Sequence, residues 1–120
     1  GGKISESAYL CLKLAWIYRG EIQEAKANGA AQERISMYEK YEKEYLEDAY
    51  RGFKQARETE YPPIAGMDEN TITYLLTSIG IHCGKIDEAR RYGSALLISR
   101  TASMKLKNKT RDVLETIKKN

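Results

Sequence analysis

Hydrophobic residues recur every three or four positions along most of this chain, which is the spacing of an amphipathic helix. No stretch alternates apolar and polar residues as a half-buried strand would. The pattern predicts helices over about 5–19, 31–60, 68–82, 86–99 and 102–118. We therefore expect an all-α protein with about five helices, the second of them unusually long.

The first predicted helix is apolar on nearly every side. Ser5 or Ser7 can cap its start, and it ends either before Gly20 or at about Ala27, because nothing between them forbids a helix. A helix that is apolar all round is expected to lie between neighbours on several sides. Trp16 is thus expected in the core rather than as a ligand platform.

Tyrosines mark the first half of the long second helix, at Tyr38, Tyr41 and Tyr45. Their rings combine an apolar body with a polar edge, which suits a packing surface or a binding surface. We favour packing and keep self-association as the alternative. Tyr61-Pro62-Pro63 is expected to end this helix, because proline has no amide to donate and restricts the residue before it.

Three boundary signals follow in the second half of the chain. Asp68 is placed to cap the third helix, and Gly84 to form a tight turn between the third and the fourth. Thr101 or Ser103 can cap the fifth, which has a narrow apolar stripe opposite its lysines. One-sided patterning is typical of a helix that closes a stack.

Composition limits the class of protein. The chain has 120 residues, 42% hydrophobic and 31% charged, and no apolar run approaches the roughly 18 residues of a membrane span. One soluble domain is expected, over 3–120, with Gly1-Gly2 read as a cloning remnant or a cut inside a longer protein. Cys11 and Cys83 lie far apart without nearby ligands, so we expect free thiols in the reducing cytoplasm, no metal and no cofactor.

The helices on either side of Gly84 resemble a tetratricopeptide repeat, in which a tight turn joins two antiparallel helices. Leu76 and Thr77 match the pattern on the first helix, and Ala89 matches the close-packing position on the second. Smaller side chains stand at three positions where that family usually has large ones: Thr73, Gly80 and Gly93.

The first two helices match the same repeat better but are split by an insertion. Their matching residues are Leu14, Ala15 and Tyr18 on the first helix and Ala49, Phe53 and Ala56 on the second. The resemblance implies a right-handed stack of antiparallel helix pairs. Pair one covers 5–60 with an insertion at 20–38, pair two covers 68–100, and a capping helix covers 102–118.

Four further segments carry a more specific resemblance: 45–50, 61–63, 68–75 and 99–103. With them, the chain is similar to the C-terminal helical part of a family of uncharacterised bacterial proteins. Members of that family carry a cysteine-rich, zinc-ribbon-like segment ahead of this part. No Cys-x-x-Cys occurs here, so that metal site does not carry over. The resemblance implies a domain of unknown function from a larger protein.

The repeat register predicts an inner face that binds a peptide or protein segment. The residues on this face would be Tyr9, Leu12, Trp16 and Arg19 from pair one, Tyr74, Ser78, Ile81 and His82 from pair two, and Lys105 and Lys109 from the capping helix. The two lysines resemble the positions with which some tetratricopeptide domains hold a C-terminal carboxylate. Leu12, Trp16 and Leu75 stand where that clamp has lysine or asparagine, which favours a hydrophobic or aromatic groove instead. We therefore expect a non-enzymatic module that binds an unidentified protein or peptide.

Other functions are less well supported. A homodimer formed through the tyrosines of the second helix is the main alternative. Nucleic-acid binding rests on the basic residues of the last helix, but the net charge of only +3 does not favour it. An enzyme is not favoured either, because the only histidine, His82, has no cysteine or carboxylate at catalytic spacing.

Overall fold

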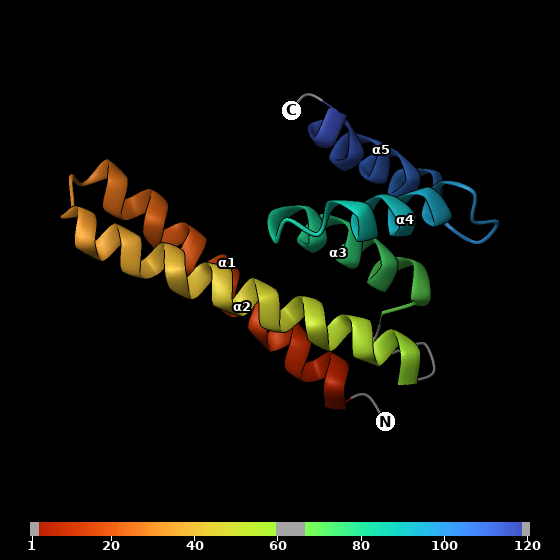
Figure 1. Cartoon of the computed structure of the whole chain (residues 1–120), viewed down its shortest axis with the longest axis horizontal. Coiled ribbons are helices and arrows are strands. Elements are labelled where there is room, and N and C mark those ends of the chain that lie inside the picture. The colour runs from red at the N-terminus through yellow and green to blue at the C-terminus, as the bar shows by residue number, and fades with distance from the viewer. Residues whose placement is uncertain (1–2, 60–66, 119–120) are drawn as a thin grey trace.

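The computed structural model describes residues 3–59 and 67–118. It shows five helices within them, α1 (Lys3–Ala27), α2 (Gln32–Thr59), α3 (Glu69–His82), α4 (Ile86–Leu97) and α5 (Met104–Lys118) (Figure 1). The predicted all-α class is confirmed. The expected helix end at Tyr61-Pro62-Pro63 and the expected remnant Gly1-Gly2 lie outside the described residues.

The first two helices form a long hairpin, to which α3, α4 and α5 add at one end (Figure 1). α1 runs to Ala27, the longer of its two predicted lengths, and Gly29 makes the turn with a φ of 67°. The segment expected to be an insertion, 20–38, supplies the distal ends of both helices. The expected cap at the start of α1 is wrong, because Lys3 is already helical and Ser5 is fully buried within the helix.

A main core joins the first three helices. Its fully buried large side chains include Leu12, Phe53, Ile72 and Leu76. The hairpin can close tightly around this core because Gly52 has no side chain: a Cβ atom there would lie 2.7 Å from the Cβ atom of Ala8. The two helix backbones therefore lie close together at Gly52 and Ala8.

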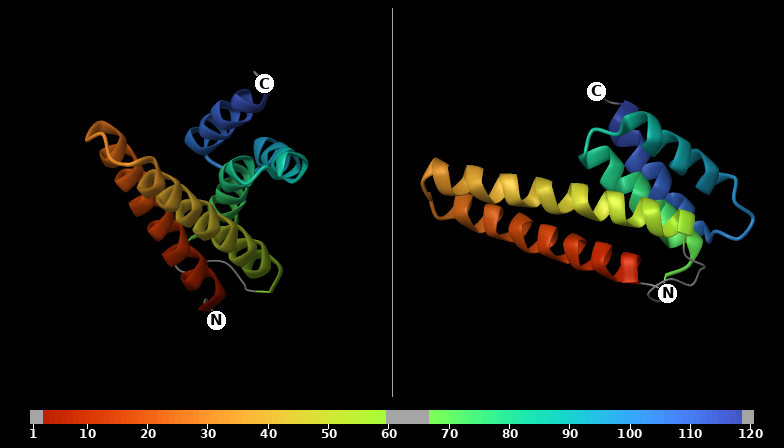
Figure 2. Two further views of the ribbon diagram at one scale, coloured as in Figure 1. Left: turned by 60° about the vertical axis from the view of Figure 1, so that its left-hand side comes forward. Right: turned by 60° about the horizontal axis from the view of Figure 1, so that its bottom comes forward.

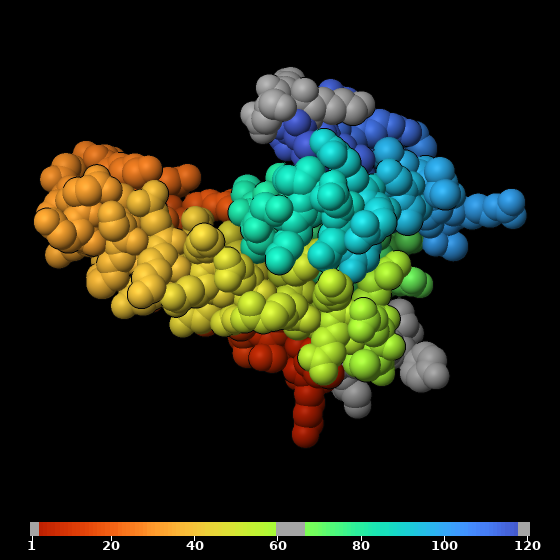
Figure 3. Space-filling view, viewed as in Figure 1, coloured from red at the N-terminus to blue at the C-terminus, as the bar shows by residue number. Residues whose placement is uncertain are grey.

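The far end of the hairpin has a second, smaller core, which we call the tip core. Ile22 and Ala25 of α1 pack there against Ile35 of α2, and Ala30 and Tyr38 cover them in part. The space-filling view shows the distal half of the hairpin standing clear of α3, α4 and α5 (Figure 3). Contacts within the hairpin therefore hold the tip core together.

The predicted caps and the tight turn of the second half are confirmed. Asp68 Oδ1 accepts a hydrogen bond from the Thr71 amide at 2.8 Å at the start of α3, and Ser103 Oγ accepts one from the Leu106 amide at 3.1 Å at the start of α5. Gly84 has a φ of 76°, a left-handed conformation that favours glycine. The sequence signals at these three boundaries thus placed the helices correctly.

The two glycines that depart from the repeat pattern lie against large side chains of other helices. A Cβ atom on Gly80 would lie 3.1 Å from the ring of Tyr50, and one on Gly93 would lie 2.9 Å from Cδ1 of Leu114. Tyr50 also donates a hydrogen bond to Glu88 Oε1 at 2.5 Å, which links α2 to α4. Neighbouring helices thus fill the space that larger residues occupy in the usual pattern.

One prediction about α1 is wrong. Its backbone lies beside α2 alone, so it is an edge helix rather than one enclosed by neighbours (Figure 2). Trp16 is 48% exposed, and Leu10 and Ile17 are 59% and 58% exposed. No described helix covers the side of α1 that carries Leu10 and Ile17, so this apolar side stays open.

Candidate functional site

A groove of about 570 Å³ lies between α1 on one side and α3 and α5 on the other. Trp16 lines it from α1, Tyr74 and Leu75 from α3, and Leu106 and Lys109 from α5. The remaining lining residues are polar: Asp68, Asn70, Thr71, Thr101, Ser103 and Lys105. We call this the inner groove. Three helices far apart in the chain thus contribute an apolar wall with cations beside it.

The charges of the inner groove are mainly positive. Lys109 Nζ lies 5.9 Å from the centre of the Tyr74 ring, within reach of a cation–π contact. Burial raises the pKa of Tyr74, and the charge of Asp112 raises it further, so the phenol stays protonated at neutral pH. Among the described residues, neither Lys105 nor Lys109 forms an ion pair. The two ammonium groups are therefore available to an anionic ligand.

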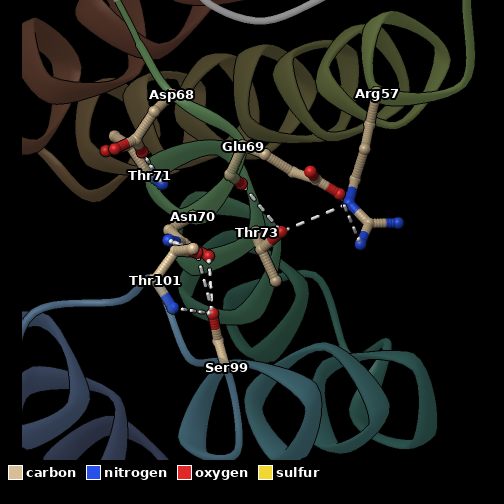
Figure 4. Close-up of polar contacts among 8 residues, drawn as sticks. All are labelled: Arg57, Asp68, Glu69, Asn70, Thr71, Thr73, Ser99 and Thr101. Atoms are coloured by element: carbon tan, nitrogen blue, oxygen red, sulfur yellow. Dashed lines mark hydrogen bonds and ion pairs between the residues drawn. The ribbon is translucent and has the colours of Figure 1, made fainter.

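A network of polar side chains includes two residues that line the groove, Asn70 and Thr101 (Figure 4). Asn70 Nδ2 donates to Thr101 Oγ1 at 2.9 Å, and Ser99 Oγ donates to Asn70 Oδ1 at 3.3 Å. These bonds tie the start of α3 to the loop between α4 and α5. Two of the segments that carry the family resemblance, 68–75 and 99–103, meet at this point.

Arg57 connects the hairpin to the other helices beside this network (Figure 4). Its Nε donates to Thr73 Oγ1 at 3.2 Å, and its Nη2 lies 3.7 Å from Glu69 Oε1. Its guanidinium carbon lies 5.4 Å from the centre of the Tyr92 ring. One side chain of α2 thereby holds α3 and α4, which helps to fix the position of α3 relative to the hairpin and so the width of the groove.

The structure brings four of the ten predicted inner-face residues into the inner groove, namely Trp16, Tyr74, Lys105 and Lys109. The prediction for Leu12 is wrong, because its side chain is only 2% exposed and belongs to the main core. Leu12 packs in the main core with residues of α2 and α3, whereas Trp16, one turn further along α1, lines the groove.

The other five predicted residues lie outside the lining of the groove. Tyr9 is half-buried with Lys13 Nζ 4.7 Å from its ring centre, and Ser78 and Ile81 are half-buried on α3. None of these three residues lines the inner groove. The last two, Arg19 and His82, belong to a separate charged cluster.

Arg19 and Glu42, in the middle of the hairpin, lie near enough to His82 at the end of α3 to influence its pKa. Arg19 Nε lies 3.0 Å from Glu42 Oε2. Burial lowers the pKa of His82, the positive charge of Arg19 lowers it further, and Glu42 opposes the change. His82 is therefore neutral at physiological pH. The opposite charges of Arg19 and Glu42 pair with each other.

The tyrosines of α2 pack within the chain. Tyr18 of α1 lies at their centre, with ring centroids 5.9 Å from Tyr38, 5.3 Å from Tyr41 and 5.9 Å from Tyr45. All four rings are half-buried. The tyrosines of α2 thus pack against α1, as favoured from the sequence. A role for them in self-association stays a prediction.

Reactive chemistry has few candidates in the part of the chain that the structure describes. Burial raises the pKa of the thiols of Cys11 and Cys83, so neither is an activated thiolate. Within residues 3–59 and 67–118, no group of three or more His, Cys, Asp or Glu side chains could hold a metal ion. No helix in these segments is sufficiently long and apolar to pass through a bilayer.

Sequence reasoning missed part of the groove. Leu106 belongs to an apolar stripe visible in the sequence, but a stripe alone does not tell which of its residues reaches solvent. Leu75 stands at a clamp position of the repeat but was not among the ten predicted inner-face residues. Asn70 and Thr101 gave a signal of another kind, since both stand in the segments that carry the family resemblance. Their contact across 31 positions of sequence is visible only in three dimensions.

A family model described as "Uncharacterized protein conserved in bacteria (DUF2225)" matches residues 1–117. The chain belongs to this family. Membership in DUF2225 confirms the predicted resemblance to an uncharacterised bacterial family, and the match spans all five helices. No curated protein and no solved structure matches the chain. The description of DUF2225 assigns no activity to the family.

Proposed function

We propose that this chain is a tetratricopeptide-like binding module without enzymatic activity, and that its inner groove holds an extended segment of another protein. The helix order supports this proposal. Each described helix packs against the next, which gives two antiparallel pairs and a closing helix. In such stacks the first helix of each pair lines the inner surface. The helices in that position here are α1, α3 and α5, and all three line the inner groove.

The observation that carries the proposal is the exposure of Trp16 in the groove. The indole is 48% exposed, and Tyr74 and Leu75 line the same groove from α3. Aromatic side chains that surround a partner's apolar group are common anchors of protein interfaces. A leucine or phenylalanine side chain of a partner would fill this space and remove its own surface and that of Trp16 from water.

The charges of the groove define the rest of the partner. Lys105 and Lys109 lie one helical turn apart on α5, and both line the groove. A glutamate or aspartate next to the apolar residue would pair with these ammonium groups. We therefore propose an acidic peptide segment with a large apolar side chain as the ligand. A nucleic acid fits less well, because few cations line the groove and affinity for phosphates grows with their number.

Intrinsic fluorescence tests this proposal directly, because Trp16 is the only tryptophan of the chain. The probes are two short synthetic peptides that contain phenylalanine and leucine, separated by glutamate in one and by lysine in the other. We expect the glutamate peptide to change the emission of Trp16 saturably and the lysine peptide to leave it unchanged. Replacing Lys109 with alanine should weaken binding roughly two- to fivefold, the size of one partly exposed charge contact.

Lys107→Ala is the matched control, because Lys107 is on the same helix but does not line the groove. Tyr74→Ala should weaken binding of the glutamate peptide, since it removes an apolar wall of the groove. Equal weakening by Lys107→Ala and Lys109→Ala would show that the charge of the whole protein, and not the groove, attracts the peptide. An emission spectrum that neither peptide changes would overturn the proposal.

A further inference from the structure

A second exposed apolar surface lies on α1, away from the inner groove. Leu10, Leu14 and Ile17 are 59%, 37% and 58% exposed. They are spaced by four and three residues, so they form one stripe along the helix, which we call the outer stripe. The stripe lies opposite the face that buries Ala8 and Leu12 against α2. No described residue outside α1 covers the stripe closely enough to bury it.

Isolated exposed leucines are common, but a continuous stripe of large apolar residues along a helix is typical of a helix–helix interface. The edge position of α1 leaves this side of the helix open to a partner (Figure 2). Trp16 projects about 100° around the helix axis from Ile17, because each residue turns the helix by that angle. A partner helix on the outer stripe would therefore leave the inner groove open.

The charges at the two ends of the stripe indicate what covers it. At the same helical spacing, the stripe continues to Lys3 toward the N-terminus and to Glu21 and Glu24 toward the C-terminus. All three side chains are exposed, and none forms an ion pair among the described residues. The C-terminal end is thus negative, and Lys3, with the exposed Glu6 beside it, is the cation at the N-terminal end. A second copy of the same helix complements this arrangement only if it runs in the opposite direction.

One antiparallel register joins apolar and charged positions of the two stripes. If Leu10 lies opposite Leu14 of a second copy, the two-fold axis passes the helix at the level of Leu12. Ser7 then lies opposite Ile17, and Lys3 lies opposite Glu21. Each of these pairs occurs twice by symmetry. A parallel arrangement would instead place Lys3 beside Lys3 and Glu21 beside Glu21.

We propose that this protein forms a homodimer in which two α1 helices pack antiparallel along their outer stripes, with Lys3 of each copy paired to Glu21 of the other. Overlap of the helices from Lys3 to Glu21 covers about 27 Å at 1.5 Å per residue. An interface of one helix pair lies at the low end of known sizes, below about 1,200 Å². The dimer is therefore weak, with a dissociation constant of micromolar order.

Sedimentation equilibrium of the whole chain from about 1 to about 500 μM tests the proposal, since this range spans the expected dissociation constant. The variants are Lys3→Glu and Glu21→Lys, with Lys40→Glu on the exposed side of α2 as the matched control for charge. Each single reversal should weaken the dimer roughly tenfold, because it turns two ion pairs into two repulsions. The control should leave the dissociation constant unchanged.

The decisive measurement mixes the Lys3→Glu variant with the Glu21→Lys variant. In a mixed dimer the two introduced side chains, a carboxylate on one copy and an ammonium group on the other, face each other. The unchanged Lys3 and Glu21 form the second pair, so both attractions are restored. We expect the mixture to associate about as tightly as the unmodified protein, although neither variant does so alone.

Folding is controlled separately. Both reversals lie on exposed positions, so circular dichroism should show an unchanged helix content for each variant. A protein that stays monomeric throughout the concentration range, or a mixture no tighter than its components, would falsify the proposal.

Discussion

The close approach of α1 and α2 at Gly52 leads to a quantitative prediction about stability. Gly52 and Gly20 both lie inside long helices, so replacing either with alanine should gain the same helix propensity, about 1 kcal/mol. Their surroundings differ. A Cβ atom on Gly20 would meet nothing within 4 Å, whereas one on Gly52 would lie 2.7 Å from the Cβ atom of Ala8.

The separation of 2.7 Å is shorter by about 1 Å than the optimum for two carbon atoms. The helices of the Gly52→Ala variant must therefore move apart, and overpacking of this kind costs about 1–3 kcal/mol. After the gain in propensity, Gly52→Ala should lower the free energy of unfolding by about 0–2 kcal/mol. Gly20→Ala should raise it by about 1 kcal/mol, so the two variants differ by about 1–3 kcal/mol.

Thermal and urea unfolding followed by circular dichroism measure this difference, which corresponds to roughly 4–12 °C in Tm for a chain of this size. The double variant Ala8→Gly/Gly52→Ala is the specific control, because it moves the methyl group from one helix to the other and removes the clash. We expect its stability to recover well beyond the sum of the two single changes. If Gly52→Ala stabilised the protein as much as Gly20→Ala does, the close approach of the two helices would be refuted.

Two further predictions concern the α3–α4 unit. Replacing Gly84 with alanine should lower the free energy of unfolding by about 1–2 kcal/mol, because a residue with a side chain is strained at its φ of 76°. Gly84→Asn should lower it less, since asparagine tolerates this conformation better. Equal losses for the two variants in urea unfolding would contradict the left-handed strain at this turn. Hydrogen bonds from Tyr50 and Lys54 lower the pKa of Glu88 in the folded protein. These hydrogen bonds therefore stabilise the folded protein at pH values above about 4.3, the pKa of a glutamate in the unfolded chain. This stabilisation is lost as the pH falls through the lower pKa that Glu88 has in the folded protein. Glu88→Gln should destabilise the protein at neutral pH and flatten the acid side of its stability profile, and an unchanged profile would show that this carboxylate does not stabilise the fold.

Local signals in the sequence predicted most helix boundaries, because caps and turns depend on a few neighbouring residues. Asp68, Gly84 and Ser103 each act within one helical turn, and each has the predicted role. The surroundings of α1 were not predictable in this way. An apolar side chain such as Trp16 looks the same in a sequence whether a neighbour covers it or solvent does, and only the order of packed helices decides between them.

The same limit applies to the inner groove. The repeat register assigned Trp16, Tyr74, Lys105 and Lys109 to one surface, and the structure brings them together because α1, α3 and α5 face one another. The register failed at Leu12, because the main core buries this residue, whereas Trp16, one turn further along α1, lines the groove. The polar end of the groove depends on contacts between segments about thirty positions apart, which no local pattern encodes.

The separate tip core divides the hairpin into two parts of unequal thermodynamic strength. Three small or medium side chains, Ile22, Ala25 and Ile35, hold the tip, whereas ten residues from three helices form the main core. Amide hydrogens near the Gly29 turn should therefore exchange with solvent by local opening, while those around Phe53 should exchange only on global unfolding. The tip is consequently the natural place to join another protein to this chain, since a sequence inserted after Gly29 would leave the packing around Phe53 unchanged.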